Sequence, residues 1–549
     1  MPQELLDYGT FSSMRTQLAR EYEGKINMSP NAELVYKDVY GKKLETGVPE
    51  TIAERMSAVS LDVASNDLRY LPEGMSLEQK LGYVTERARR YMEMQVDNIF
   101  RANTPTNINF GRWNATYDES GQLTGYEMVS QLGSACFVIP IEDTFGDHAQ
   151  TVYESDGILA AWVEQQLLQK GGGGTGLSGC ALRPKGSILR YNPAVDGMKS
   201  MDWAHSRNVS SGFESFLEHY FNPSTDAVKQ GNSRRGANMG IQRIDHMDFL
   251  DHIYAKFGRN KDRLEWRLKN FNLSMSVTDE FMEAAANGGM YTLYNPHRAN
   301  PKIKSVLEKK FGVQNPEVVR KGDLATKEQF ERIMTANAAN LFSPVTTPNM
   351  YLAENETDVI NAYTGEKIGT IMNDIVYINA SSVLDIISKL SHSNGEPGMV
   401  FIDRINENNP ILNVVEYDAT NPCGEQPLPP HTACNLGSIN VGKFARYNVF
   451  EDEGKAREVL GRELFLDPFT KIERTRDGKV SVNYFDWQGL DHAIEDGIRF
   501  LDNVIDRGDF PTDKVTEAVA RTRKVGLGYM GVYDAMVLMK KRYGSEESF

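Results

Sequence analysis

Five consecutive residues, Asn421-Pro422-Cys423-Gly424-Glu425, place an amide, a thiol and a carboxylate within one short segment. Side chains alternate faces along an extended backbone, and a proline favours extended geometry in the residue before it. Asn421, Cys423 and Glu425 would then share one small space and could form a reaction centre. A second cysteine, Cys434, follows eleven positions after Cys423. The alternative is a proline-glycine loop that holds a buried cysteine with a packing role.

The residues around this segment form a longer motif. Residues 421–441, NPCGEQPLPPHTACNLGSINV, resemble the active-site loop of ribonucleotide reductases. The match continues, in the family's own order, through SACFVIPIEDT (134–144), GGGGTGLSGCALRPKG (171–186), KQGNSRRGANMG (229–240), NFNLSMSVTDEFM (270–282), PGMVFIDRINENNP (397–410) and VGLGYMGVYDAM (525–536). The NPCGEQPLPP and SACF motifs are more similar to those of the adenosylcobalamin-dependent (class II) branch than to those of the class I branch, which depends on a metal-bearing subunit.

The resemblance implies a radical mechanism for replacing the ribose 2′-hydroxyl by hydrogen. Cys423 is then the thiyl-radical residue that removes and later returns the 3′-hydrogen atom. Glu425 takes the 3′-OH proton as general base, and Asn421 holds the ribose hydroxyls. The family pattern names Cys136 and Cys434 as the dithiol that supplies two electrons, ends as a disulfide and needs an external thioredoxin- or glutaredoxin-type reductant. The alternative for this pair is two unrelated core cysteines.

Glycine-rich segments can bring a backbone close to a phosphate. The run Gly171–Gly174, followed by Thr175-Gly176, has this character, although such a run is more often a linker or turn. The resemblance implies that Gly174, Thr106 and the backbone around Ala135 contact the ribonucleotide substrate. The remaining cysteine, Cys180, matches no functional position, and we interpret it as a packing residue.

The resemblance also implies a deoxynucleotide effector. Asp143 and Arg183 match positions that hold the effector's sugar and phosphate. Lys229, Gln230 and Arg234 lie in the loop that connects the effector with the substrate base, although a solvated basic turn is the alternative. The segment 187–210 is longer than the family's glycine-rich segment, which puts effector control in doubt.

Two further patterns do not predict sites. Gly526-Leu527-Gly528-Tyr529-Met530-Gly531 fits the dinucleotide motif, but too few residues follow it for the rest of that unit, and we expect a packing turn. His246 and His252 are six residues apart, which does not place them on one helical face, and no third ligand is nearby. We therefore predict no metal site.

The composition agrees with a cytoplasmic enzyme, and the resemblance implies that it binds nucleotides and not polymers. The 549 residues carry a formal charge of −15, and an acidic chain without a basic stripe argues against nucleic acid as the main partner. No apolar run approaches the roughly 20 residues that span a membrane, and the first residues do not read as a signal peptide. Four cysteines are too few for a disulfide scaffold.

The elements that must position these residues are of two kinds. Residues 1–100 predict a mainly helical region, because Leu81, Val84, Ala88, Tyr91 and Met92 follow three- and four-residue steps within 76–100. Over 101–549, short apolar runs alternate with amphipathic stretches such as 491–506, which indicates an α/β fold. The resemblance implies a ten-stranded α/β barrel with the Cys423 loop in its centre.

The chain also departs from the family in two places. Segment 443–486 is longer than usual, and 471–482 predicts a surface hairpin with a turn at Asp477-Gly478. Family members continue beyond the segment that matches at 525–536, whereas this sequence ends at Phe549. We therefore expect a complementary C-terminal polypeptide as a partner.

Three functional classes remain open. The first is a class II reductase that uses adenosylcobalamin. The second is a class I catalytic subunit that receives its radical from a separate metal-bearing subunit. The third is a nucleotide-binding fragment that is inactive alone. Homodimerisation and the choice between di- and triphosphate substrates are open.

Overall fold

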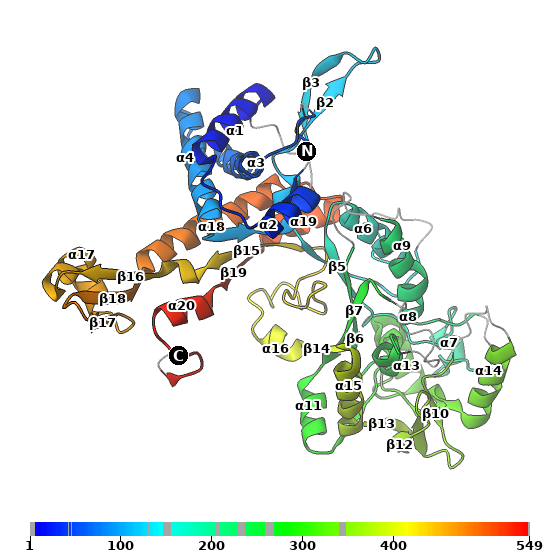
Figure 1. Cartoon of the computed structure of the whole chain (residues 1–549). Helices are drawn as coiled ribbons and strands as arrows, with labels where there is room; N and C mark the ends of the chain where they lie inside the picture. The colour runs from blue at the N-terminus through cyan, green and yellow to red at the C-terminus, as the bar shows by residue number, and fades with distance from the viewer. Residues whose placement is uncertain are drawn as a thin grey trace. The chain divides into compact units, whose positions relative to one another are not determined.

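The computed structural model divides into two compact units (Figure 1). The helical unit comprises Met1–Ala135 and Ala433–Phe549, and the sheet unit comprises Cys136–Thr432. The structure describes residues 6–41, 43–45, 47–129, 132–146, 155–204, 208–228, 236–257, 268–339 and 347–546.

Helices dominate the first part of the helical unit, as predicted. The predicted helix in 76–100 is α4, Leu77–Val96, and it begins with a capping box in which Ser76 and Gln79 exchange hydrogen bonds. Its apolar face, including Val84 and Ala88, is buried in the core of this unit. The other elements of this part are α1 (Tyr8–Tyr22), α2 (Pro30–Val35), η1 (Tyr36–Tyr40), α3 (Ile52–Ser65), η2 (Asn66–Arg69), β1 (Phe100–Ala102), α5 (Thr104–Asn109), β2 (Trp113–Tyr117) and β3 (Leu123–Met128).

The second part of the helical unit packs against the first. The long amphipathic helix α18, Trp487–Arg507, confirms the prediction for 491–506 and contacts α3 and α4. Within this contact, Arg507 Nε donates to Asp62 Oδ1 at 2.6 Å, and both side chains are buried. A buried ion pair of this kind is costly to break, because the remaining charge is left without a partner.

Strands and shorter helices complete the helical unit. Strand β15 pairs antiparallel with β1 and parallel with β19. The predicted hairpin is confirmed, because β17 and β18 are antiparallel and Gly478 takes a positive φ of 86° in the turn between them. The dinucleotide-like glycines lie largely within β19 and not in a packing turn, so that expectation is wrong. The elements are β15 (Ala433–Asn440), η6 (Val441–Phe444), β16 (Ala445–Phe450), α17 (Glu453–Leu466), β17 (Lys471–Arg474), β18 (Val480–Phe485), α19 (Asp513–Thr522), β19 (Val525–Met530) and α20 (Val532–Leu538).

A parallel sheet organises the sheet unit. In the part of this unit that the structure describes, five strands are neighbours in the same order as they occur along the chain. They are β4 (Cys136–Ile139), β5 (Gly174–Ser178), β6 (Asn238–Arg243), β7 (Phe271–Val277) and β14 (Gly398–Phe401). Parallel strands need crossover connections, and helices such as α6 (Ile158–Lys170) and α15 (Ala380–Asn394) supply them. Together with the N-terminal helices, this arrangement confirms the predicted α/β class.

A second sheet lies between β7 and β14 in the chain. Its order is β8-β13-β12-β11-β10-β9, and most of its pairs are antiparallel. The strands are β8 (Met290–Thr292), β9 (Ala325–Thr326), β10 (Met350–Leu352), β11 (Asp358–Asn361), β12 (Lys367–Met372) and β13 (Ile375–Asn379). The helical segments of the sheet unit not yet given are α7 (Pro193–Asp196), α8 (Phe213–Phe216), η3 (Leu217–Phe221), α9 (Asn222–Ala227), α10 (Phe249–Tyr254), α11 (Asp279–Ala286), α12 (Pro296–Ala299), α13 (Pro301–Phe311), η5 (Lys321–Asp323), α14 (Lys327–Ala339) and α16 (Ile402–Glu407).

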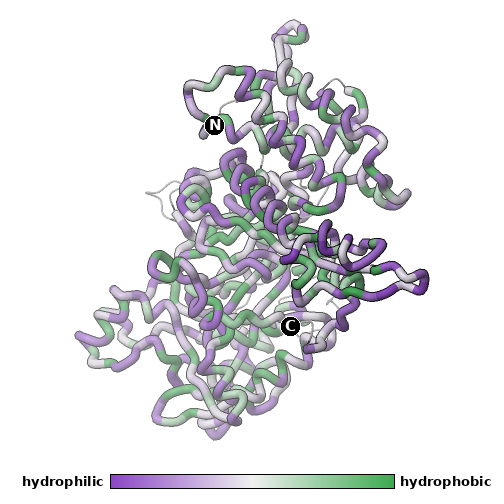
Figure 2. The backbone as a smooth tube through the Cα atoms, turned by 90° about the vertical axis from the view of Figure 1, so that its left-hand side faces the viewer, coloured by the Kyte–Doolittle hydropathy of each residue, from purple (hydrophilic) through white to green (hydrophobic). Residues whose placement is uncertain are grey.

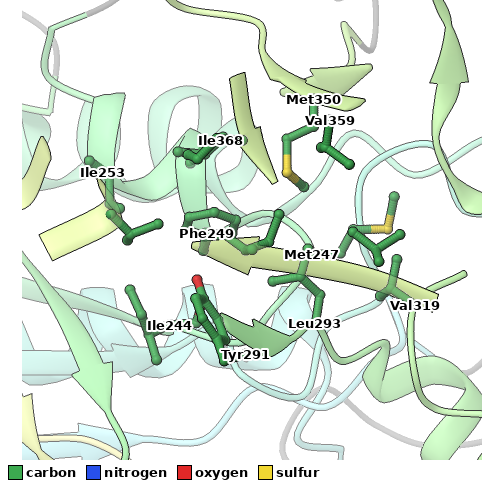
Figure 3. Packing of buried hydrophobic residues seen from close by; sticks show 14 of the residues in the cluster. Ile244, Met247, Phe249, Ile253, Tyr291, Leu293, Val319, Met350, Val359 and Ile368 are labelled. Atoms are coloured by element: carbon green, nitrogen blue, oxygen red, sulfur yellow. The ribbon is translucent and has the colours of Figure 1, made fainter. Parts of the chain in front are cut away.

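The core of the sheet unit forms where α10 meets the second sheet. Phe249 of α10 packs among Met247, Leu293 and Val359, all of them buried (Figure 3). Along the backbone, hydrophobic and hydrophilic residues alternate within most helices and strands (Figure 2). This packing gives the parallel sheet a rigid support on which side chains at its two ends can be held in place.

Candidate active site

The Asn421–Glu425 segment is a tight turn. Gly424 N donates to Asn421 O at 3.1 Å, and Gly424 takes a positive φ of 84°. Pro422 occupies the second position of this turn, where its fixed φ is favourable. The expectation of an extended segment with alternating faces is therefore wrong, because the proline and glycine together favour a chain reversal over a strand.

Asn421 stabilises this turn from within. Its Oδ1 accepts a hydrogen bond from Gln426 N at 2.9 Å, and its backbone N–H donates to Gln426 O at 3.1 Å. Its Nδ2 donates to Cys136 Sγ at 3.2 Å. Asn421 is buried, so its amide both shapes the turn and fixes the distance to Cys136.

Cys136 connects the turn with the parallel sheet. Its thiol lies 3.9 Å from Glu425 Oε1, a weak hydrogen bond, and Cys136 pairs in register with Gly174 as the first residue of its strand. The structure therefore brings together Cys136, Asn421, Glu425 and Gly174 at the amino ends of β4 and β5. We call these residues with Cys423 the cysteine cluster. Cys423 and Glu425 are exposed, whereas Cys136 and Asn421 are buried.

The sheet holds the turn through close backbone contacts. A Cβ atom at Gly176 would lie 1.8 Å from Thr420 O, so only glycine permits this approach. Asn272 Nδ2, near the amino end of β7, donates to Pro422 O at 2.7 Å. A glycine of the predicted phosphate-binding segment thus seats the cysteine turn against β5.

Three predicted residues belong to the helical unit. Cys434 is buried at the start of β15, and its thiol lies 3.3 Å from Asn435 O. Thr106 is buried in α5 and donates its hydroxyl to Gly133 O at 2.9 Å. Ala135 is partly buried. The pairing of Cys136 with Cys434 stays a prediction.

The predicted effector residues Asp143 and Arg183 are brought together beyond the carboxyl ends of β4 and β5. Arg183 Nε donates to both oxygens of Asp143, at 2.9 and 3.0 Å, and His297 Nδ1 donates to Asp143 Oδ2 at 2.9 Å. Burial alone would raise the pKa of Asp143, but the hydrogen bonds from His297 and Arg183 outweigh burial and lower it. We call these three residues the charged cluster. Lys229, Gln230 and Arg234 lie outside the described residues.

The charged cluster borders a cavity of about 760 Å³ at the carboxyl ends of the parallel strands. Its lining includes Cys180, Arg243 at the end of β6, Ser276 of β7 and Asp403 after β14. Burial raises the pKa of the Cys180 thiol to about 12. Ligands of α/β proteins commonly bind at the carboxyl ends of parallel strands. Cys180 is thus a neutral thiol beside a cavity of ligand size.

The two histidines that we excluded as metal ligands have internal partners. His246 Nε2 lies 2.9 Å from Leu182 O, and its Nδ1 accepts from Asp248 N at 3.0 Å. His252 lies between Glu214 and Gly240 O. Over the residues that the structure describes, no three His, Cys, Asp or Glu side chains are grouped to hold a metal ion. Over the same residues, none of the helices combines the length and apolarity that crossing a membrane requires.

Sequence reasoning missed two histidines near the predicted sites. His297 carries no motif, although Asn295-Pro296 before it marks the start of α12. His431 lies within the quoted 421–441 motif but received no role. Its ring lies 3.1 Å from both Glu164 Oε1 and Asp156 Oδ1.

Comparison with known proteins identifies the family. Residues 134–549 match the ribonucleotide reductase barrel domain family. The chain belongs to the ribonucleotide reductase family. It is 28% identical over 529 residues to the vitamin B12-dependent ribonucleoside-diphosphate reductase of Thermoplasma acidophilum, covering 96% of this chain and 46% of that protein. It is 27% identical over 525 residues to the enzyme of the same name from Mycobacterium tuberculosis, covering 95% of this chain and 52% of that protein.

A relative whose name does not mention vitamin B12 is less similar than these two proteins. The ribonucleoside-diphosphate reductase large subunit of African swine fever virus is 23% identical over 431 residues, covering 76% of this chain and 42% of that protein. The comparisons thus support the resemblance to the class II branch. The chain spans about half the length of the first two relatives.

Proposed function

We propose that this chain carries the radical and reducing thiols of a vitamin B12-dependent ribonucleotide reductase. The observation that carries the proposal is the cysteine cluster, in which Cys136 lies 3.2 Å from Asn421 Nδ2 and 3.9 Å from Glu425 Oε1. Cys136 is more than 280 positions away from Asn421 and Glu425 in the chain. A thiol, an amide and a carboxylate so placed match the needs of ribose reduction. Because the named relatives act on ribonucleoside diphosphates, we propose a diphosphate substrate.

In the proposed reaction, one ribonucleotide and two thiols yield one deoxyribonucleotide, one disulfide and one water. Cys423 removes the 3′-hydrogen atom, and Glu425 accepts the 3′-OH proton. The C2′–O bond then breaks, and the oxygen leaves as water after protonation by a thiol. Cys136 and Cys434 supply two electrons and two protons and become a disulfide, and a C2′–H bond forms. Glu425 returns its proton to the 3′-oxygen, and Cys423 returns the 3′-hydrogen atom. A thioredoxin- or glutaredoxin-type protein then reduces the disulfide.

The proposed reaction needs a radical source that can approach Cys423. Adenosylcobalamin is a bulky group, and the Cys423 turn fits it, because Cys423 is exposed and a Cβ at Gly424 would meet nothing within 4 Å. When bound, the cofactor supplies the radical that Cys423 needs. Cys423 and Gly424 are the residues that would face it.

We further propose that the charged cluster contributes to effector binding. Its cavity of about 760 Å³ lies within the usual size range of small-molecule sites. The Asp143 carboxylate already accepts hydrogen bonds from Arg183 and His297. An effector sugar would therefore have to compete with these two side chains for the carboxylate.

A complementary polypeptide is the partner that we propose for the helical unit. Strand β19 pairs with β15, and over the described residues no second partner strand is found for it. Large apolar side chains are exposed on α18, β19 and α20 and just after α20, namely Ile494, Ile498, Tyr529, Tyr533, Val537 and Tyr543. A free strand edge with exposed apolar side chains is suited to main-chain pairing with another polypeptide.

The proposal can be tested by reconstitution. The chain should be mixed with a polypeptide that corresponds to the C-terminal part of its B12-dependent relatives, then assayed for deoxynucleotide formation with adenosylcobalamin and dithiothreitol. We expect turnover only when all components are present, and higher thermal stability as partner concentration rises above its Kd. Turnover that requires an iron- or manganese-bearing protein in place of cobalamin would assign the chain to class I. A dimer of this chain alone that is active would contradict the complementary polypeptide.

A further inference from the structure

His431 adopts a conformation that is unfavourable for its backbone. Its φ is +58°, in the left-handed region, which is uncommon for residues other than glycine, although asparagine, aspartate and histidine occupy it more often than most. Such a conformation persists only where surrounding contacts determine it. His431 has these contacts, because its backbone N–H donates to Val138 O at 2.9 Å and Val138 N donates to Thr432 O at 3.3 Å. These bonds hold 431–432 against β4, the strand that begins with Cys136.

The imidazole of His431 bridges two carboxylates. Nδ1 lies 3.1 Å from Glu164 Oε1 on α6, and Nε2 lies 3.1 Å from Asp156 Oδ1 just before α6. Carboxylates accept hydrogen bonds, so both contacts are satisfied only when both ring nitrogens carry a proton. Over the residues that the structure describes, the charged side chains facing the ring are Asp156 and Glu164, since β4 and residues 427–432 carry none. His431 is therefore an imidazolium between two negative charges.

We propose that His431 is a positioning residue whose protonated ring clamps the segment after the Cys423 turn to α6. On its amino side the turn lies against β5 at Gly176, and on its carboxyl side the clamp holds the following segment to α6. The distance between Glu425 and Cys136 then depends on both fastenings. The consequence for reduction rests on the proposed function, but the clamp itself does not.

Protonation gives the clamp a pH limit. Burial alone would lower the pKa of His431, but the hydrogen bonds and charges of Asp156 and Glu164 raise it to about 9. Because the pKa of the folded form is raised above the ordinary value of 6.5, the stabilisation is complete below that value and is lost as pH rises through about 9.

The test is pulse hydrogen exchange read by mass spectrometry, which needs no turnover. We expect protection of the Val138 and His431 amides, corrected for the intrinsic exchange rate, to fall as pH rises through about 9. His431→Asn removes the bridge but tolerates a positive φ, so it should lower this protection about tenfold at pH 7. Glu164→Gln keeps the histidine and should move the loss of protection to lower pH.

Two controls separate the clamp from general destabilisation. His392 is an exposed histidine at the end of α15, and His392→Asn should leave protection unchanged. The amides of β7 serve as an internal reference in every variant. Equal protection in His431→Asn and the parent, or a pH profile that Glu164→Gln does not shift, would overturn the proposal. If His431→Asn fails to fold, Asp156→Asn provides the same comparison as Glu164→Gln.

Discussion

The two ends of the parallel sheet carry side chains of different chemistry, held by contacts of different strength. At the amino ends, the cysteine cluster is held by weak contacts to sulfur, and Cys423 and Glu425 are exposed. At the carboxyl ends, the charged cluster is held by close bonds between charged or polar groups around a cavity. Charge-assisted hydrogen bonds are about twice as strong as neutral ones. The comparison agrees with the proposal of a reactive end, where weak contacts can change during a reaction, and a binding end, where the charged groups are already paired with one another.

The most direct test of the reactive end is Cys423→Ser in the reconstituted enzyme. We expect deoxynucleotide formation to fall to the assay background, because a hydroxyl cannot replace a thiol as a carrier of a hydrogen atom. Nucleotide binding, measured by calorimetry, should be nearly unchanged. The matched control is Cys180→Ser at the binding end, which should retain turnover. Substantial turnover in Cys423→Ser would end the assignment of the radical to this residue.

Thiol reactivity should also distinguish the two ends. Only the thiolate reacts with iodoacetamide, and a pKa raised to about 12 keeps Cys180 almost entirely protonated at pH 8. Cys423 is exposed, so we expect it to be alkylated at least about a hundredfold faster than Cys180. Peptide mapping of each cysteine over time measures both rates. Similar rates would contradict the raised pKa of the Cys180 thiol.

Secondary-structure elements with local signals could be predicted from the sequence better than the shape of the site. Helix α4 and the β17–β18 hairpin could be predicted because their apolar periodicity and their turn residues are local signals. The resemblance assigned Cys136, Asn421 and Glu425 to one active site, and the structure places them together. The shape of their segment was predicted wrongly, since a single proline can precede either an extended residue or a turn.

The histidines could not be predicted because their roles depend on partners far away in the chain. His297 meets Asp143 across 154 positions, and His431 meets Glu164 across 267. No periodicity or short motif encodes such pairs. The contact of Gly176 could not be predicted for the same reason. The glycine run suggested phosphate binding, whereas in the structure the missing side chain of Gly176 lets the Thr420 backbone approach β5.

Gly176→Ala should damage the reactive end through packing. The new methyl group would lie 1.8 Å from Thr420 O, so either the turn or β5 must move. We expect a loss of about 3 kcal/mol in the free energy of unfolding, measured by urea denaturation, which is at the upper end for overpacking. Gly322→Ala is the matched control, because a Cβ there meets nothing within 4 Å. A neutral Gly176→Ala would show that the turn is not seated as described.

Asp143→Asn should have the smallest effect and should remain confined to the binding end. The variant keeps the shape of the side chain but removes the charge that Arg183 and His297 share. We expect a loss of about 1–3 kcal/mol at pH 7. The folded pKa of Asp143 lies below the ordinary value of 3.8, so its stabilisation is present above that value and is lost as pH falls through the folded pKa. The difference between parent and variant should therefore shrink in acid.

The control for this change is Asp385→Asn on α15, where an exposed pair with Lys389 should contribute less than about 1 kcal/mol. Distant, independent sites act additively, so Asp143→Asn should leave the alkylation rate of Cys423 unchanged. If the parent and Asp143→Asn differ equally in stability above and below the pKa of Asp143, the carboxylate charge is not what stabilises the charged cluster. A changed Cys423 rate would instead show that the two ends of the sheet are coupled, and the division into a reactive and a binding end would then have to be given up.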